Sequence, residues 1–122
     1  MNNAQWTTFC NANELSSKTY AVDPNGTLIH GNAVFSVEGM SFQFQVASGV
    51  SSNVTYEGRA RVTAYDPATR TAQAECIGYS AENPASQAPC RIVFGDAASS
   101  FSAQLQWPDS TEYKPWIVGK VK

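Results

Sequence analysis

Cysteine, histidine and the carboxylates are the residues of this sequence most able to carry out chemistry, and their spacing limits what that chemistry can be. The three cysteines are Cys10, Cys76 and Cys90, and His30 is the only histidine. The chain has no Cys-x-x-Cys pair, so the spacing does not predict a zinc or other metal site. No cofactor is expected, because the sequence also lacks a glycine-rich phosphate loop.

Cys76 and Cys90 enclose the longest irregular stretch of the sequence, 77–89. Alternation places both side chains on the apolar face of their segments, so they point inward from neighbouring strands. Residues directly opposite each other across a hairpin have Cβ atoms ~4.5–5.5 Å apart, and a disulfide needs ~3.5–4.5 Å. Cys76 and Cys90 are therefore a candidate disulfide, with two buried thiols as the alternative. Cys10 is left as an unpaired thiol.

His30 raises the hypothesis of an enzyme, in which it would act as a general base beside a carboxylate. A catalytic histidine also needs a nucleophile and an orienting group, and the sequence singles out neither. The four aspartates are predicted to occur in turns, where the side chain bonds the local backbone: Asp23, Asp66, Asp96 and Asp109. Together with the absence of Gly-x-Ser-x-Gly, these features favour a protein that binds over one that catalyses.

The elements that must position these residues are predicted to be β-strands. Apolar and polar residues alternate without a break in 40–46 and 101–107, and again across 54–64. This period of two is typical of strands with one face on a core. Asp66-Pro67 predicts a type I turn that joins 54–65 to 70–79. The best helical candidate is 11–18, which is one or two turns long.

These strands predict one all-β domain over 1–122, an antiparallel meander of about eight strands. A small up-and-down barrel is preferred, and a β-sandwich is the alternative. In strand number and chain length the sequence resembles lipocalin-like barrels. The resemblance is one of architecture alone, because no motif of a named family is present, and it implies no site residues.

The inward face of the central hairpin is formed by small residues: Gly58, Ala60, Ala64, Ala72 and Ala74. Small residues on one wall leave room for a ligand inside the barrel, unless large residues of the opposite wall fill it. The leading hypothesis is therefore a non-enzymatic binding protein that holds a small apolar or aromatic ligand. The predicted wall is Phe42, Phe44, Tyr56, Ala60, Ala74, Phe94 and Phe101.

A second hypothesis places binding on the outside of the domain. The segment 107–116 combines three aromatic residues with a polar loop: Trp107, Tyr113 and Trp116. Aromatic side chains at a loop rim can stack on sugars or anchor a protein. The faces formed by Ser41, Gln43 and Gln45 and by Ser102, Gln104 and Gln106 are polar but uncharged. They suit a carbohydrate or a protein partner, and they make a homo-oligomer plausible.

Charge and hydropathy argue against two classes of partner. The net charge is −2, and the arginines are spread over separate segments, so the sequence lacks the basic footprint of a nucleic-acid-binding protein. No apolar run approaches the ~20 residues of a membrane helix. The polar N-terminus does not read as a signal peptide. The expectation is a cytoplasmic protein, or a secreted one whose signal peptide has been removed.

Overall fold

The computed structural model describes residues 4–24, 28–48, 52–78, 86–106 and 111–122, without the side chains of 23–30, 44 and 46–56. The elements are α1 (Ala4–Ala12), η1 (Leu15–Ser17), β1 (Thr19–Pro24), β2 (Leu28–Ser36), β3 (Gly39–Ser48), β4 (Ser52–Asp66), β5 (Thr71–Ile77), β6 (Gln87–Phe94), η2 (Asp96–Ala98), β7 (Ser100–Gln106) and β8 (Tyr113–Val121).

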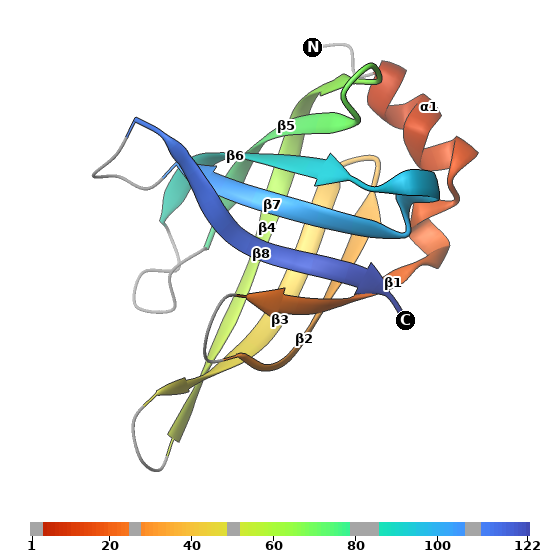
Figure 1. The fold of residues 1–122 in the computed structure, drawn as a ribbon. Coiled ribbons are helices and arrows are strands. Elements are labelled where there is room, and N and C mark those ends of the chain that lie inside the picture. Colours follow the sequence, from red (N-terminus) through yellow and green to blue (C-terminus); the bar gives the residue numbers. More distant parts are fainter. Residues whose placement is uncertain (1–3, 25–27, 49–51, 79–85, 107–110) are drawn as a thin grey trace.

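The strands form a closed antiparallel barrel in the order β1-β2-β3-β4-β5-β6-β7-β8, with β8 pairing back onto β1 (Figure 1). This confirms the all-β barrel predicted from the alternation. Because the barrel is closed, the first strand, β1, pairs with the last strand, β8, as is usual for up-and-down barrels. Each strand pairs with the next in sequence.

Helix α1 covers one end of the barrel (Figure 1). Trp6, Phe9 and Cys10 share one face of the helix because they are three and four residues apart. The Trp6 ring is fully buried and packs on Phe35 and Phe94, and its Nε1 donates a hydrogen bond to the Val37 carbonyl at 3.1 Å. The helix therefore fills this end of the barrel with an aromatic side chain.

The prediction of a helix over 11–18 was wrong in position. The α-helix spans Ala4–Ala12, so only its last two residues and the short η1 turn lie within the predicted range. The helix ends at Asn13 and Glu14. Glu14 adopts a left-handed conformation at φ 51°, and the side-chain amide of Asn13 donates a hydrogen bond to the Phe9 carbonyl at 3.0 Å. The apolar face of 4–12 is so short that only its contacts with the barrel distinguish it as a helix.

A β-bulge changes the predicted face of β4. The pairing of β4 with β5 shifts register between Val62 and Ala64. The extra residue reverses the alternation, so Tyr65 is buried and Ala64 is exposed. The prediction that Ala64 points inward was therefore wrong, whereas Ala60, Ala72 and Ala74 are buried as expected.

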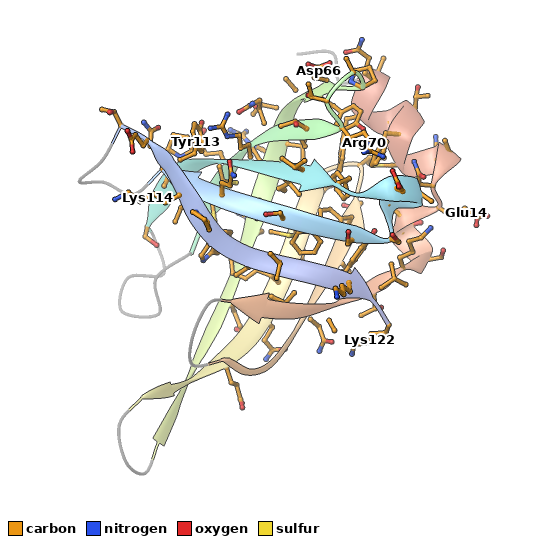
Figure 2. All side chains as sticks on the ribbon, viewed as in Figure 1. Glu14, Asp66, Arg70, Tyr113, Lys114 and Lys122 are labelled. Atoms are coloured by element: carbon orange, nitrogen blue, oxygen red, sulfur yellow. The ribbon has the colours of Figure 1, made fainter. Side chains whose placement is uncertain are left out.

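The core is richest in aromatic rings at the α1 end of the barrel. Phe35 lies at the centre, 5.2–5.4 Å from the rings of Tyr20, Phe94 and Phe101. The labelled charged side chains lie at the periphery, with Asp66 and Arg70 near α1 and Lys114 at the opposite end (Figure 2). In the described part of the chain, no helix has the length and apolar character needed to cross a membrane.

Candidate functional site

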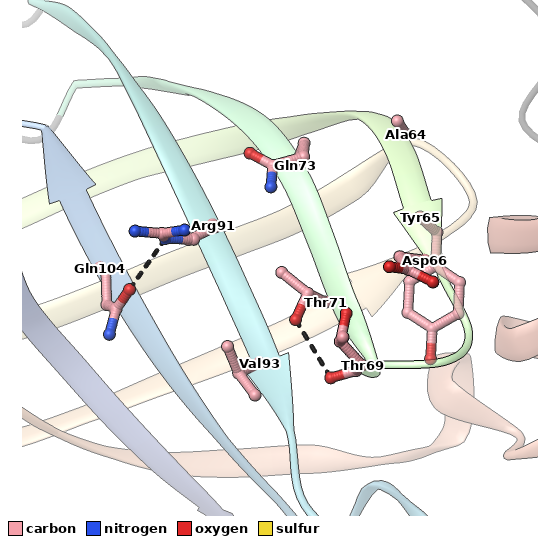
Figure 3. Close-up of a pocket in the computed structure, with 9 residues that line it drawn as sticks. All are labelled: Ala64, Tyr65, Asp66, Thr69, Thr71, Gln73, Arg91, Val93 and Gln104. Atoms are coloured by element: carbon pink, nitrogen blue, oxygen red, sulfur yellow. Dashed lines mark hydrogen bonds between the residues drawn. The ribbon is translucent and has the colours of Figure 1, made fainter. Parts of the chain in front are cut away.

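A groove on the outer wall of the barrel, lined by both polar and apolar groups, is the candidate site. It runs over β4, β5, β6 and β7 and has a volume of about 390 Å³ (Figure 3). That volume lies within the range of small-molecule sites. The lining residues are Ala64, Tyr65, Asp66, Thr69, Thr71, Gln73, Arg91, Val93 and Gln104.

Strand register places the polar residues of the groove in a row. Gln73 of β5 is directly opposite Arg91 of β6, which is directly opposite Gln104 of β7. The bulge in β4 adds Ala64 opposite Gln73. Directly paired residues share a face of the sheet, so the bulge places a small side chain beside the Gln73–Arg91–Gln104 row.

Arg91 is held in place by two neighbours. Its Nε donates a hydrogen bond to Gln104 Oε1 at 2.9 Å, and its guanidinium carbon lies 4.0 Å from the centre of the Tyr113 ring. The side chain of Gln104 points toward that guanidinium in Figure 3. Among the described residues, Arg70–Asp96 is an ion pair in which Arg91 takes no part. The groove thus presents a cation held at its Nε, whose guanidinium carries further N–H donors.

The α1 side of the groove is formed by the β4–β5 turn. Asp66 Oδ1 accepts a hydrogen bond from the Ala68 N–H at 2.9 Å, and Thr71 Oγ1 donates to the Thr69 carbonyl at 3.1 Å. The ring of Tyr65 packs under the turn against Phe9, with centroids 4.6 Å apart. Burial is the largest effect on Tyr65 and raises the pKa of its phenol, so this hydroxyl stays protonated at neutral pH.

A second hollow of about 570 Å³ lies over β3, β4 and β5 next to the β2–β3 turn. Exposed Arg59 and Arg61 contribute to its lining together with Val37 and Ile77. Its lining contains none of the aromatic residues predicted to bind a ligand. It brings these two cations together with Glu38 on a solvated face, which is the usual arrangement for such residues.

The predicted site residues separate into an inner and an outer group. Inside the barrel, the structure buries Phe42, Ala60, Ala74, Phe94, Phe101 and Trp116. Phe94 and Phe101 belong to the aromatic cluster at the α1 end, while Phe42 packs edge-on against Trp116 with centroids 5.1 Å apart. Outside the barrel, Tyr113 is partly exposed beside Arg91. The structure therefore places Tyr113 and Trp116 on different sides of the wall.

Four residues singled out from the sequence lie wholly or partly outside what the structure describes. Phe44 and Tyr56 are directly paired in β3 and β4, but the description does not cover their side chains. The side chain of His30 is also outside the description. Trp107 lies outside the described residues altogether. The hypothesis of an apolar ligand inside the barrel therefore stays a prediction.

The cysteine pair is buried and offset. Both side chains point inward, but Cys76 is opposite Ala88 and Cys90 is opposite Ala74, so the two are diagonal neighbours. All three cysteines are free thiols. A hydrogen bond with Cys90, aided by burial, raises the pKa of Cys76 far above that of an ordinary thiol. The disulfide between Cys76 and Cys90 stays a prediction for the oxidised protein.

Groups of three or more metal-ligating side chains are absent from the described residues. Arg91 and Gln73 are among the groove residues that the sequence alone did not single out. Their only signal was register, since the predicted hairpins place 73 near 91, and neither residue belongs to a recognisable motif. Gln104, by contrast, was part of a predicted Ser/Gln-rich face.

Comparison with known proteins adds no relative: no family model, curated protein or solved structure matches the chain.

Proposed function

We propose that this chain is a non-enzymatic binding module that takes a carbohydrate in the outer groove over β4 to β7. The observation that carries the proposal is the Gln73–Arg91–Gln104 row, in which Arg91 is fixed by Gln104 and the Tyr113 ring.

The chemistry of the lining suits sugar hydroxyls, which both donate and accept hydrogen bonds. The amides of Gln73 and Gln104 offer donors and acceptors, and the guanidinium of Arg91 offers donors only. Thr69 and Thr71 add hydroxyl groups at the turn. A hydroxylated ring can therefore meet a partner of either kind along the groove.

Pre-organisation of Arg91 lowers the cost of binding. A free arginine loses side-chain entropy when a ligand immobilises it, on the order of 0.5–1.5 kcal/mol for such a side chain. Here the hydrogen bond to Gln104 and the contact with Tyr113 have already restricted the guanidinium. The apolar surfaces of Ala64 and Val93 lie beside these polar groups, which matches the C–H faces of a sugar.

The groove is better suited to binding than to hydrolysis. Glycosidases use two carboxyl groups that flank the scissile bond. Asp66 is the carboxylate among the lining residues, and its Oδ1 is engaged by the Ala68 N–H of the turn. The described lining therefore supplies one carboxylate, which is also part of the local turn.

The experiment is an NMR titration of the ¹⁵N-labelled full chain with a panel of neutral and acidic oligosaccharides. We expect shifts at Gln73, Arg91 and Gln104, and we expect Arg91→Lys to weaken binding by about tenfold because lysine lacks the planar fork of donors. Arg59→Lys is the matched control, because Arg59 is exposed on another part of the wall.

The proposal fails if every sugar in the panel leaves the groove resonances unmoved, or if Arg91→Lys binds as tightly as the unaltered chain. Shifts confined to barrel-interior residues such as Phe42 and Ala74 would instead favour the predicted interior site.

A further inference from the structure

Strand β4 extends well beyond its partner β5. It covers Ser52–Asp66, but its pairing with β5 begins at Arg59, opposite Ile77. The part of β4 from 52 to 57 is paired by β3 alone among the described residues. Figure 1 shows this β3–β4 hairpin projecting past the barrel. We call residues 44–48 and 52–57 the projecting ribbon.

The register identifies which backbone groups of β4 face away from β3. The Val62 N–H donates to the Glu38 carbonyl at 3.1 Å, so residue 62 directs its backbone polar groups toward the β3 side. Pairing between β3 and β4 is regular from 52 to 61, and these directions alternate along an antiparallel strand. Asn53, Thr55 and Glu57 therefore direct their N–H and C=O groups away from β3, to an edge that pairs with no strand among the described residues. We call this the free edge.

The ribbon carries few of the usual protections against edge pairing. Natural edge strands carry lysines, prolines or bulges that prevent another strand from adding on. From Gly39 to Tyr56 the sequence contains no charged residue and no proline. The β3–β4 pairing has no register shift, although β2–β3, β4–β5 and β7–β8 each contain one.

We propose that the free edge of β4 in the projecting ribbon is a homodimer interface, where a second copy of this chain adds its own β4 antiparallel across a two-fold axis. The axis passes by Thr55, so that Thr55 is opposite Thr55 of the second copy. Each copy supplies the same edge, as a two-fold interface requires, and the paired edges complete each other's backbone hydrogen bonds.

The charges agree with this arrangement. With the axis at Thr55, Glu57 of one copy is opposite Asn53 of the other, so the two like charges do not face each other. A net charge of −2 per chain also makes repulsion between copies small. An acidic or basic peptide would gain little charge complementarity from the ribbon, whose one charged residue is Glu57, whereas a second copy requires none.

The test is the solution mass of the full chain by light scattering and sedimentation equilibrium over a range of concentrations. We expect twice the monomer mass of 13.2 kDa for the unaltered chain. Thr55→Pro should give the monomer, because proline removes the N–H at the axis. That N–H points away from β3, so the hairpin itself keeps its hydrogen bonds, and proline is tolerated at such edge positions. Thr55→Val is the matched control, which keeps the N–H and should stay dimeric.

A second measurement is independent of how well the proline variant folds. Thr55→Cys should be captured as a covalent dimer by a short bifunctional thiol reagent, because the axis places both copies of residue 55 together. Glu112→Cys, exposed and far from the ribbon in sequence, should not. A monomer at every concentration would overturn the proposal. So would a dimer that persists in a folded Thr55→Pro variant and is not cross-linked through residue 55.

Discussion

At the scale of the residue, the β4–β5 turn contains a backbone conformation that disfavours its side chain. Arg70 ends the turn at φ 52°, in the left-handed region, while its carbonyl accepts the Phe94 N–H at 2.9 Å. Its guanidinium pairs with Asp96 at 2.6 Å, but the two side chains are 48% and 96% exposed. An ion pair this exposed contributes little to stability, whereas a left-handed L-residue costs about 1–2 kcal/mol.

We therefore expect Arg70→Gly to raise the free energy of unfolding by about 0.5–1 kcal/mol, because glycine adopts this conformation without steric cost. Urea denaturation monitored by tryptophan fluorescence measures the change. Arg70→Ala is the control, since it removes the charge but keeps the Cβ atom, and it should be neutral or slightly destabilising. Equal destabilisation by both variants would show that the ion pair matters more than the backbone.

At the scale of the element, the β4–β5 hairpin tests whether the barrel interior has room for a ligand. Ala74 is 7% exposed and points inward, opposite Val62 and Cys90 in the neighbouring strands. Ala64 belongs to the same hairpin, but the bulge in β4 turns it outward. The two alanines therefore form a matched pair that differs in the face of the wall.

We expect Ala74→Leu to lower the free energy of unfolding by about 1–3 kcal/mol, because added methylene groups overpack a filled core. Ala64→Leu should change it by less than about 0.5 kcal/mol, as for other surface positions. Denaturation measures both. A second measurement is native mass spectrometry of the unaltered chain and of Ala74→Leu. If Ala74→Leu stabilises the chain, and a small molecule that co-purifies with the unaltered chain is absent from the variant, the result favours a ligand inside the barrel over a filled core.

At the scale of the whole molecule, several protonated acids are buried in one barrel. Burial raises the pKa of Cys10 from about 9 to about 11, against a smaller lowering by a backbone hydrogen bond. Burial also raises the pKa of Tyr20 from about 10 to about 12, and its hydroxyl donates to the Ala98 carbonyl. The native state therefore holds these protons more tightly than the unfolded chain does.

Stability should consequently fall at alkaline pH. Above the unfolded pKa values, the unfolded chain releases protons that the native state keeps, so the free energy of unfolding decreases as pH rises. We expect it to be insensitive to these groups below about pH 8.5 and to fall from pH 9 to pH 12, as measured by urea denaturation at each pH. Cys10→Ala should reduce the fall in the free energy of unfolding between pH 9 and pH 11. Tyr20→Phe should reduce the fall between pH 10 and pH 12. A slope unchanged in both variants would contradict this assignment.

The sequence by itself determined the strands and most of their faces, because the alternation of side chains is a local property of the extended backbone. It placed Cys76, Cys90, Phe42 and Phe101 inward, as observed, and the Asp66-Pro67 turn joined the correct strands.

Tertiary structure decided the rest. Only the pairing of β8 with β1 separates a barrel from a sandwich, and only non-local register brings Gln73, Arg91 and Gln104 into one row. One bulge reversed Ala64 and Tyr65, because a single extra residue changes the face of every position after it until the register is restored. Contacts with the barrel likewise decided where the helix lies, since a helix as short as α1 has little stability of its own.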